Sequence, residues 1–233
     1  IADYFDVARQ TGESLTFDAR IMCVGKTVWA HWNLRSLPET GQFYLVGRDI
    51  SELKHSEQRF RSFVENEIYP YEDEVERTGE VPQEIAERIK QKTIDLGFYA
   101  CNFPESVGGA GLSHLEFALV ERELGRGSMA LNHFFGRPQN ILMACEGEQI
   151  ERYLLPAVRG ERMDALAMTE PDAGADVRGM TCTAVRDGGD WVVNGTKHFI
   201  SGADHADFII VFIATGEDQT PKGPKKRITA FLV

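Results

Sequence analysis

Cysteine is scarce in this sequence: the 233 residues contain four, and no two of them form a C-x-x-C pair. They stand at Cys23, Cys101, Cys145 and Cys182. Isolated cysteines of this kind signal neither a zinc site nor a disulfide framework. A reducing compartment is therefore expected, and the prediction is a cytoplasmic location.

Long hydrophobic runs are also lacking. No apolar stretch approaches the roughly 20 residues that a membrane-spanning helix needs, and no basic and apolar leader opens the sequence. The chain begins with Ile1 rather than Met and stops within RITAFLV, a run typical of a strand. We therefore expect no membrane span, and we expect the sequence to be a fragment of a longer protein.

Basic charge is in deficit, with 25 Lys and Arg against 36 Asp and Glu and a net charge of −11. Nucleic-acid binding needs clustered basic side chains on phosphates, so nucleic acid is not an expected partner. The basic run KGPKKR, residues 222–227, is predicted to be a solvated loop.

Three short runs of β-branched and aromatic residues fill the first fifty positions. They are LTFDARIMCV, TVWAHWNLRSL and GQFYLVGRDI. These runs predict a three-stranded antiparallel sheet. Apolar residues then recur every three or four positions, which predicts a helix. Its apolar positions are Leu53, Phe60, Val64, Ile68, Tyr71 and Val75.

Helical patterns continue from Val81 to about Gly160. Pro82 suits the start of a helix, and Gly97 suits the left-handed residue after its end. Two further segments, LSHLEFALVERELGRG and EQIERYLLPAV, carry apolar residues at helical spacing. This region is predicted to be a helical bundle.

After Glu161 the period falls to two, which is typical of strands. Asn194 and Gly195 stand between two β-type runs in GDWVVNGTKHFISG, and this dipeptide predicts a hairpin turn. ADFIIVFIAT and RITAFLV add two apolar strands. A small sheet, a bundle and a second sheet follow one another without βαβ alternation, so the predicted fold class is α+β.

Two further patterns do not support a site. GRGSMA, residues 125–130, matches a dinucleotide-binding pattern but follows a helix instead of a strand. DHAD, residues 204–207, offers metal-ligating side chains, yet such residues more often face water, and no metal is assigned.

The segment ALAMTEPDAGADVRG, residues 165–179, has the composition of a ligand-binding turn. A buried strand, ALAMT, runs into EPDAGAD, whose small residues let the backbone approach a ligand and present N–H groups to an anion. The predicted hairpin brings KHFIS, residues 197–201, back alongside. Both segments are expected to line one cleft.

AMTEPDAGADVRG resembles the signature of the acyl-CoA dehydrogenase family. The positions that fit are Ala167, Met168, Thr169, Glu170, Ala173, Gly174, Asp176 and Gly179. Ala175 departs from the pattern, which usually has Ser or Thr there. WVVNGTKHFISG is similar to the family's second flavin-contacting stretch, with Phe199 where Trp is commoner, and LGFYACNFPESVGGAGLSHLEFALVERELGR resembles its helical domain. The resemblance covers about Gln58 to Val233.

The resemblance implies FAD-dependent α,β-dehydrogenation of an acyl-CoA thioester, with hydride transfer to N5 of FAD and a place in fatty acid metabolism. It also implies an electron-transfer flavoprotein as acceptor and assembly as a homo-oligomer. Matching positions imply FAD contacts at Leu166, Met168, Thr169, Gly174, Ala175, Phe199, Ile200 and Ser201.

Within that set, the resemblance implies separate roles. Met168 and Thr169 would hydrogen-bond the pyrimidine edge of the flavin, where donors stabilise the charge that builds up on reduction. Gly174 and Ala175 would meet the FAD pyrophosphate, and Ala175 would also lie near the substrate. Phe199 would lie against the flavin ring, and Ser201 would donate a hydrogen bond near N5.

No catalytic residue is assigned. The family's carboxylate base lies in a C-terminal helical domain beyond the last residue of this chain, and Glu170 belongs to the flavin turn. Asp176 is expected to fix the turn. Because Ala175 lacks the hydroxyl that could donate to a phosphate, FAD binding is expected to be weaker by roughly 1.5–3 kcal/mol.

Residues 1–57 fall outside that resemblance. WAHWNLRSLPETGQFYLVGRDISELKHSEQRF resembles the last strands of a PAS sensor domain, as a natural fusion or an artificial join of two genes. The predicted division is a partial PAS-like sheet with a linker helix (1–57), the N-terminal helical domain of the dehydrogenase (58–163) and the start of its antiparallel middle β-domain (164–233). The alternative is a PAS-type sensory or interaction module whose helical part transmits or dimerises without catalysis.

Overall fold

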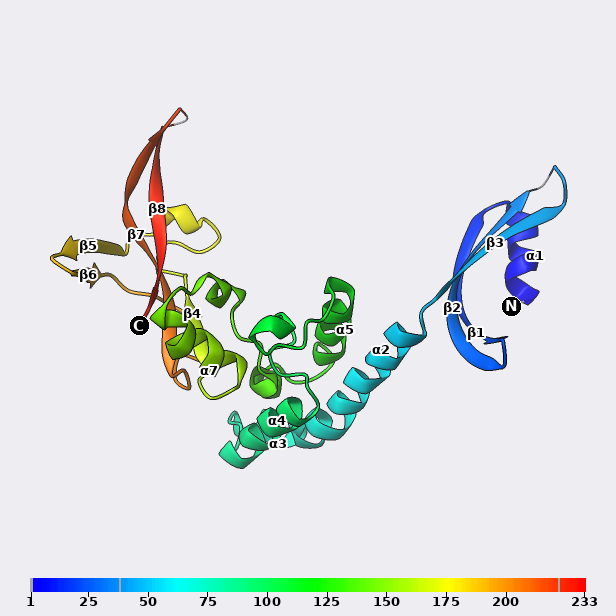
Figure 1. Ribbon diagram of the computed structural model, residues 1–233, viewed down its shortest axis with the longest axis horizontal. Coiled ribbons are helices and arrows are strands. Elements are labelled where there is room, and N and C mark those ends of the chain that lie inside the picture. The colour runs from blue at the N-terminus through cyan, green and yellow to red at the C-terminus, as the bar shows by residue number, and fades with distance from the viewer. Residues whose placement is uncertain (1, 38, 222) are drawn as a thin grey trace. The chain divides into compact units, whose positions relative to one another are not determined.

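The computed structural model describes residues 2–37, 39–221 and 223–233 (Figure 1). The chain forms two compact units. Unit 1 comprises Ile1–Pro70 and His114–Ser128, and unit 2 comprises Tyr71–Ser113 and Met129–Val233. Each unit has its own sheet and its own helices, which confirms the α+β class.

Unit 1 contains the predicted three-stranded antiparallel sheet. Its strands are β1 (Ser14–Cys23), β2 (Lys26–Leu37) and β3 (Gln42–Asp49), in that order. A helix that the sequence did not predict, α1 (Ala2–Thr11), packs on this sheet (Figure 1, blue). Ala8 is fully buried in a cluster with Phe17. The Tyr4 ring stacks on the Phe17 ring, with the centroids 4.3 Å apart. At 10 residues, α1 is too short for hydrophobic periodicity alone to separate a helix from a loop.

A hydrogen-bonded junction joins β3 to α2 (Ser51–Phe63). Asp49 Oδ1 accepts from Ser51 N at 2.8 Å, and Ser51 Oγ accepts from Trp29 N at 2.9 Å. Lys54 Nζ of the same helix lies 2.9 Å from Asp18 Oδ2 on β1. Side chains from two strands therefore hold the first turn of α2.

The predicted helix after residue 50 is confirmed. α2 continues through a π-helical turn, η1 (Val64–Ile68), into α3 (Tyr69–Thr78). In η1 the N–H of Tyr69 donates to the carbonyl of Val64, one residue further back than in an α-helix. Pro70 follows, and because proline has no N–H it cannot continue the regular ladder, which accounts for the widened turn.

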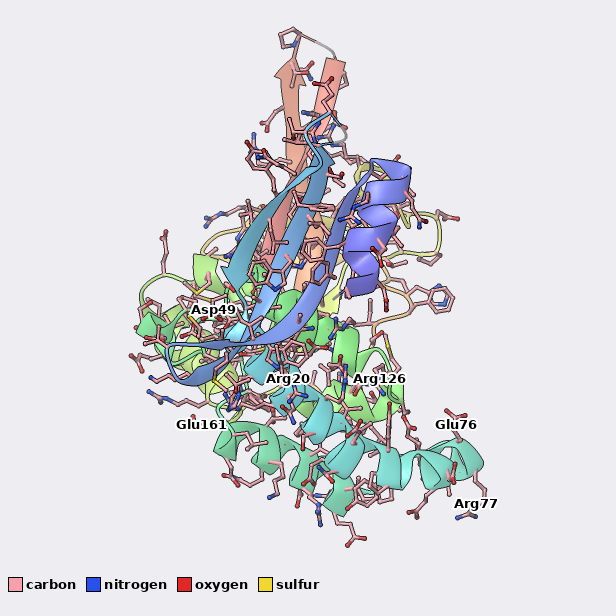
Figure 2. All side chains as sticks on the ribbon, turned by 90° about the vertical axis from the view of Figure 1, so that its right-hand side faces the viewer. Arg20, Asp49, Glu76, Arg77, Arg126 and Glu161 are labelled. Carbon is pink, nitrogen blue, oxygen red and sulfur yellow. The ribbon has the colours of Figure 1, made fainter. Side chains whose placement is uncertain are left out.

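A buried carboxylate lies at the end of α5 (His114–Leu124), which packs on α2 within unit 1. The Glu123 side chain is 1% exposed and accepts from Arg61 Nε at 3.2 Å, Arg122 Nη2 at 2.8 Å and Arg126 Nη1 at 2.8 Å (Arg126 in Figure 2). Burial raises the pKa of Glu123, but these hydrogen bonds outweigh burial and lower it to about 2. Glu123 is therefore ionised in neutral solution.

Unit 2 contains most of α3 and then α4 (Gln83–Asp95), and the helices that follow α4 are short. They are η2 (Glu105–Val107), α6 (Met129–Asn132), η3 (His133–Phe135), η4 (Asn140–Ala144), η5 (Ile150–Leu154), α7 (Leu155–Val158) and η6 (Val177–Gly179). Pro82 directly precedes α4 and Gly97 follows it with φ +68°, as predicted. No helix within the described ranges is both long and apolar enough to cross a membrane.

The sheet of unit 2 has five strands: β4 (Asp164–Ala167), β5 (Thr183–Asp187), β6 (Asp190–Asn194), β7 (Phe208–Thr220) and β8 (Gly223–Leu232). β5–β6 and β7–β8 are antiparallel, as expected. β7, however, runs parallel with β4, from the Asp164–Phe208 pair onward. The chain leaves the sheet after β6 and re-enters it at the end where β4 begins, so the sheet is mixed. Its inner face packs Phe208 and Ile210 against Phe103, Leu154 and Val158.

The predicted hairpin turn at Asn194–Gly195 is wrong. Asp187 pairs with Asp190, so the turn between β5 and β6 consists of Gly188 and Gly189, another pair that favours hairpins. Gly195 instead follows the end of β6 and lies against Cys182. Its φ is +137°, and a Cβ added to Gly195 would lie 2.3 Å from the Cys182 sulfur. Gly195 thus serves a close approach of two backbone segments.

The basic run is not a loop. Lys222 lies outside the described residues, and 223–227 belong to β8. In the strand register, Lys225 lies opposite Asp218 and Lys226 lies opposite Glu217. Arg227 forms an ion pair with Asp218. Opposite charges on the facing strands β7 and β8 therefore stabilise the hairpin that these strands form.

Candidate functional site

The first predicted ligand segment leaves the sheet at the end of β4. Ala165 and Ala167 are buried within the strand, whereas Leu166, Met168 and Thr169 are half-buried. A tight turn follows, closed by backbone hydrogen bonds between Glu170 and Ala173. Beyond it, Gly174 and Ala175 are exposed. Asp176 Oδ1 accepts from Arg178 N at 3.2 Å and caps η6 (Val177–Gly179), so its predicted role in fixing the turn is confirmed.

The second predicted segment, 197–201, lies beside the first although no hairpin brings it there. The backbone N–H of His198 donates to the carbonyl of Thr169 at 2.9 Å. Lys197 Nζ donates to the carbonyl of Met168 at 2.9 Å. Residues 195–200 have no regular secondary structure, so individual contacts such as these, and not a strand ladder, hold the segments together.

Glu170 and Lys197 form a buried ion pair between the two segments. Lys197 Nζ lies 2.8 Å from Glu170 Oε1, and the side chains are 11% and 1% exposed. Glu170 also accepts from Thr181 N, from Thr181 Oγ1 at 2.9 Å and from Cys182 N at 3.1 Å. Burial raises the pKa of Glu170, but the hydrogen bonds outweigh it and hold this pKa well below its ordinary value.

Sequence reasoning missed this pair. Glu170 was assigned to the turn without a partner, and Lys197 was not singled out. The available signal was a single Lys within WVVNGTKHFIS, a run otherwise free of charge, because a lone charge in a buried segment needs an opposite one.

Several polar groups around these segments are open to a ligand. Across residues 2–37, 39–221 and 223–233, no acceptor is bound by the backbone N–H of Thr169, Gly174 or Ala175. At Gly174 a Cβ would meet nothing within 4 Å, so packing within the chain does not explain the glycine. Unpaired N–H groups beside small residues suit an anionic ligand.

The ring of Phe199 is presented to solvent. Its side chain is 81% exposed, its φ is +58°, and the ring stacks on His198 with centroids 3.6 Å apart. A large aromatic residue in the left-handed region is uncommon and marks functional sites more often than cores. Ile200 next to it is half-buried and Ser201 is exposed.

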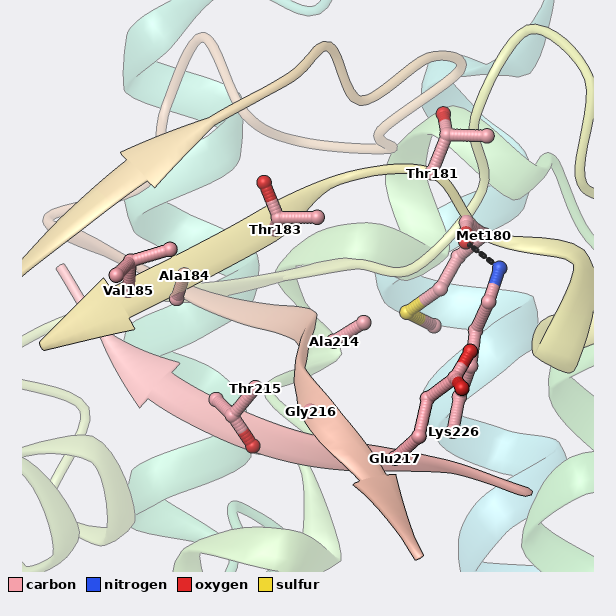
Figure 3. A pocket seen from close by; sticks show the side chains of 10 residues that line it. All are labelled: Met180, Thr181, Thr183, Ala184, Val185, Ala214, Thr215, Gly216, Glu217 and Lys226. Atoms are coloured by element: carbon pink, nitrogen blue, oxygen red, sulfur yellow. Dashed lines mark hydrogen bonds between the residues drawn. The ribbon is translucent and has the colours of Figure 1, made fainter. Parts of the chain in front are cut away.

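Another hollow of unit 2 lies over β5, β7 and β8 and has a volume of about 270 Å³ (Figure 3). Lys226 points into it, but its Nζ already donates to the carbonyl of Met180. None of the predicted site residues lines this hollow. Among the side chains that the structure describes, no three His, Cys, Asp or Glu residues lie together as a metal site would require.

Two family models match the chain. Residues 51–161 match the model described as acyl-CoA dehydrogenase, N-terminal domain, and residues 165–233 match acyl-CoA dehydrogenase, middle domain. The first match ends at residue 161 and the second begins at residue 165, at the start of β4. The sheet β1–β3 lies outside both.

Similar proteins carry related names. The 3-(aryl)acrylate reductase of Clostridium sporogenes is 37% identical over 74% of this chain and 45% of its own length. The caffeyl-CoA reductase-Etf complex subunit CarC of Acetobacterium woodii is 35% identical over 74% of this chain and 45% of its own length. A crystal structure of acyl-CoA dehydrogenase complexed with FAD from Bacillus anthracis superposes with a TM-score of 0.63 at 26% identity, over 78% of this chain and 31% of that one. The chain thus spans about half the length of the curated relatives it matches, or slightly less.

Proposed function

The chain belongs to the acyl-CoA dehydrogenase family, and on this premise we propose that residues 164–233 bind FAD for the α,β-dehydrogenation of an acyl-CoA thioester. The observation that carries the proposal is the unpaired N–H of Thr169 beside the exposed ring of Phe199, on two segments fixed to each other. FAD, when bound, supplies the two-electron acceptor for such a reaction.

The flavin ring is assigned to Leu166, Met168, Thr169, Phe199, Ile200 and Ser201. Donors at Thr169 and Ser201 suit the edge of a ring that gains negative charge on reduction. The exposed face of Phe199 suits stacking on a planar ring system. Apolar parts of Leu166 and Ile200, both half-buried, suit its hydrocarbon edge.

The pyrophosphate is assigned to Gly174 and Ala175. Both residues are exposed, their N–H groups are unpaired among the described residues, and Gly174 leaves open space. Ala175 provides no hydroxyl, so only backbone donors act there. We also place the substrate near Ala175.

Glu170 is not proposed as the catalytic base. Its carboxylate is occupied by hydrogen bonds from Lys197, Thr181 and Cys182, and its depressed pKa makes it a poor proton acceptor. No catalytic residue is assigned to this chain, and the base is assigned to a domain outside it.

For partners, we propose an acyl-CoA substrate, an electron-transfer flavoprotein as acceptor and a homo-oligomeric assembly. The relative from Acetobacterium woodii, named as part of a complex with Etf, supports the acceptor. The names of the relatives span short-chain acyl and arylacrylate substrates, so the acyl group is left open. Four free thiols favour a reducing, cytoplasmic compartment.

For the front end, we propose a PAS-like sheet over 1–57, followed by the helical domain over 58–163. The hydrogen-bonded junction at Asp49 and Ser51 supports a second candidate function, a sensory or interaction module that acts through α2. A change in the sheet would reach α2 through that junction.

Titration with FAD tests the proposed function. The purified chain is expected to bind FAD, acquire the yellow absorbance of a flavoprotein and quench flavin fluorescence. A colourless protein that leaves added FAD in the free pool would overturn the dehydrogenase assignment and favour the sensory module.

A further inference from the structure

We propose that Lys197, held in place by Glu170, is a positioning residue that polarises the Met168–Thr169 peptide group and so strengthens the Thr169 N–H as a hydrogen-bond donor to the flavin. The inference rests on the proposed FAD binding. It adds a role for two residues that the predicted contacts do not include.

The geometry places the charge on one side of a single peptide group. Lys197 Nζ donates to the carbonyl oxygen of Met168 at 2.9 Å. That carbonyl belongs to the same planar unit as the Thr169 N–H, and the peptide bond between them is trans. In a trans peptide the C=O and N–H point in opposite directions, so the N–H faces away from Lys197.

The Thr169 N–H is left for a ligand. It has no acceptor among the residues that the structure describes. The carbonyl of Thr169 itself accepts from His198 N at 2.9 Å, so the residue is restrained on its other side as well. Lys197 and His198 are neighbours in sequence and thus fix two consecutive peptide groups.

A cation on a carbonyl oxygen strengthens the N–H of the same peptide. Hydrogen bonds from an ionised donor are roughly twice as strong as neutral ones. Hydrogen bonds in a chain polarise one another, which strengthens each by about 10–30% in condensed phase. The effect is largest where water is excluded, and the Lys197 side chain is 11% exposed.

Glu170 stabilises the buried ammonium group of Lys197 and fixes its orientation. A buried charge without a partner is costly, and a hydrogen-bonded partner of opposite charge offsets much of that cost. The Glu170 carboxylate, 2.8 Å from Lys197 Nζ, is itself fixed by Thr181 and Cys182. The ammonium therefore has two anchored acceptors, Glu170 and Met168, and little freedom to turn away.

A purely structural clamp gives a different result. If Lys197 only ties the two segments together, its loss weakens oxidised and reduced FAD to the same degree. If it also polarises the Thr169 N–H, its loss weakens reduced FAD more, because reduced flavin carries the negative charge that the N–H meets. The flavin reduction potential separates the two.

The experiment uses the full chain and FAD as the probe, with affinity measured by fluorescence titration and the potential by dye equilibration. For Lys197→Met, we expect oxidised FAD to bind about tenfold less tightly and reduced FAD about a hundredfold less tightly. The tenfold difference corresponds to a potential lower by about 30 mV for a two-electron couple. Arg227→Met removes an exposed cation of the same sheet and should change neither quantity.

A second variant covers a failure of Lys197→Met to fold. The double variant Lys197→Met with Glu170→Gln removes both charges, so no unpaired carboxylate is buried, and it should keep the lowered potential. An unchanged potential in either folded variant would overturn the inference while leaving the proposed function intact. A wild-type chain that binds no FAD would overturn the proposed function and this inference with it.

Discussion

Lys197 Nζ lies 2.8 Å from Glu170 Oε1, and this buried pair joins two segments that are 27 positions apart in sequence. One segment ends β4 and the other follows β6. The unpaired Thr169 N–H and the exposed Phe199 ring are brought to the same place by this contact and by the His198–Thr169 hydrogen bond.

Phe199→Ala is expected to weaken FAD binding without loss of stability. The side chain is 81% exposed, so removing it creates no cavity in the chain. The loss of ring stacking should cost about 0.5–1.5 kcal/mol beyond the area buried. Fluorescence titration measures the affinity and thermal unfolding the stability. Tyr44→Ala, a 62% exposed aromatic on β3, is the control and should leave FAD affinity unchanged; equal affinity in Phe199→Ala would remove this residue from the site.

Ala175→Ser is expected to tighten FAD binding. A hydroxyl at this exposed position can donate to the pyrophosphate, and such a charge-assisted bond contributes about 1.5–3 kcal/mol. Calorimetric titration measures the change. Ala230→Ser, exposed on β8, adds the same hydroxyl elsewhere and should have no effect. A dissociation constant that does not move in Ala175→Ser would place residue 175 away from the phosphates.

Gly195→Ala is expected to destabilise unit 2 and to reduce FAD affinity. The added Cβ would lie 2.3 Å from the sulfur and 2.8 Å from the Cα of Cys182, so backbone must shift. Overpacking of this kind costs typically about 1–3 kcal/mol. Gly188→Ala is the control: it also replaces a glycine of positive φ, +61°, but its added Cβ meets nothing within 4 Å. Equal urea midpoints for the two variants would contradict the packing described for Gly195.

Acid should destabilise unit 1 partly through Glu123. Its pKa is lowered from 4.5 to about 2 in the folded chain, so the folded state binds the proton less readily than the unfolded state. The stabilisation is thus complete above about pH 4.5 and is lost as the pH falls toward 2. Glu123→Gln should lower the free energy of unfolding by about 1–3 kcal/mol at neutral pH. It should also flatten the acid limb, the part of the stability curve where the free energy of unfolding falls with falling pH.

Urea unfolding at several pH values checks this. Glu76→Gln, which changes an exposed carboxylate of α3, should leave the acid limb intact (Glu76 in Figure 2). An acid limb that is equally steep in wild type and Glu123→Gln would assign the acid sensitivity to other carboxylates.

Local patterns predicted most elements of the fold. Apolar residues that recur every three or four positions after Leu53 predicted α2 and α3. The β-branched runs before residue 50 predicted β1–β3. The hairpin turn was misplaced because Gly188–Gly189 and Asn194–Gly195 are both turn-forming pairs, and only the pairing of Asp187 with Asp190 decides between them. The parallel pairing of β4 with β7 joins strands that are distant in sequence, and no local sequence pattern predicts such a contact.

The candidate site was predicted in its two segments but not in what holds them. Motif resemblance placed Thr169 and Phe199, and the structure brings their segments side by side. The partnership of Glu170 with Lys197 depends on burial and on a contact between distant positions, so spacing in the sequence does not contain it. Phe199's exposure and left-handed backbone are likewise properties of the folded loop.

The decisive measurement is calorimetric titration of the wild-type chain with FAD, repeated with Phe199→Ala. We expect saturable binding of one FAD per chain, with the affinity reduced in the variant and the unfolding temperature of the unliganded protein unchanged. The absence of saturable binding to the folded wild-type chain would contradict the proposed FAD binding.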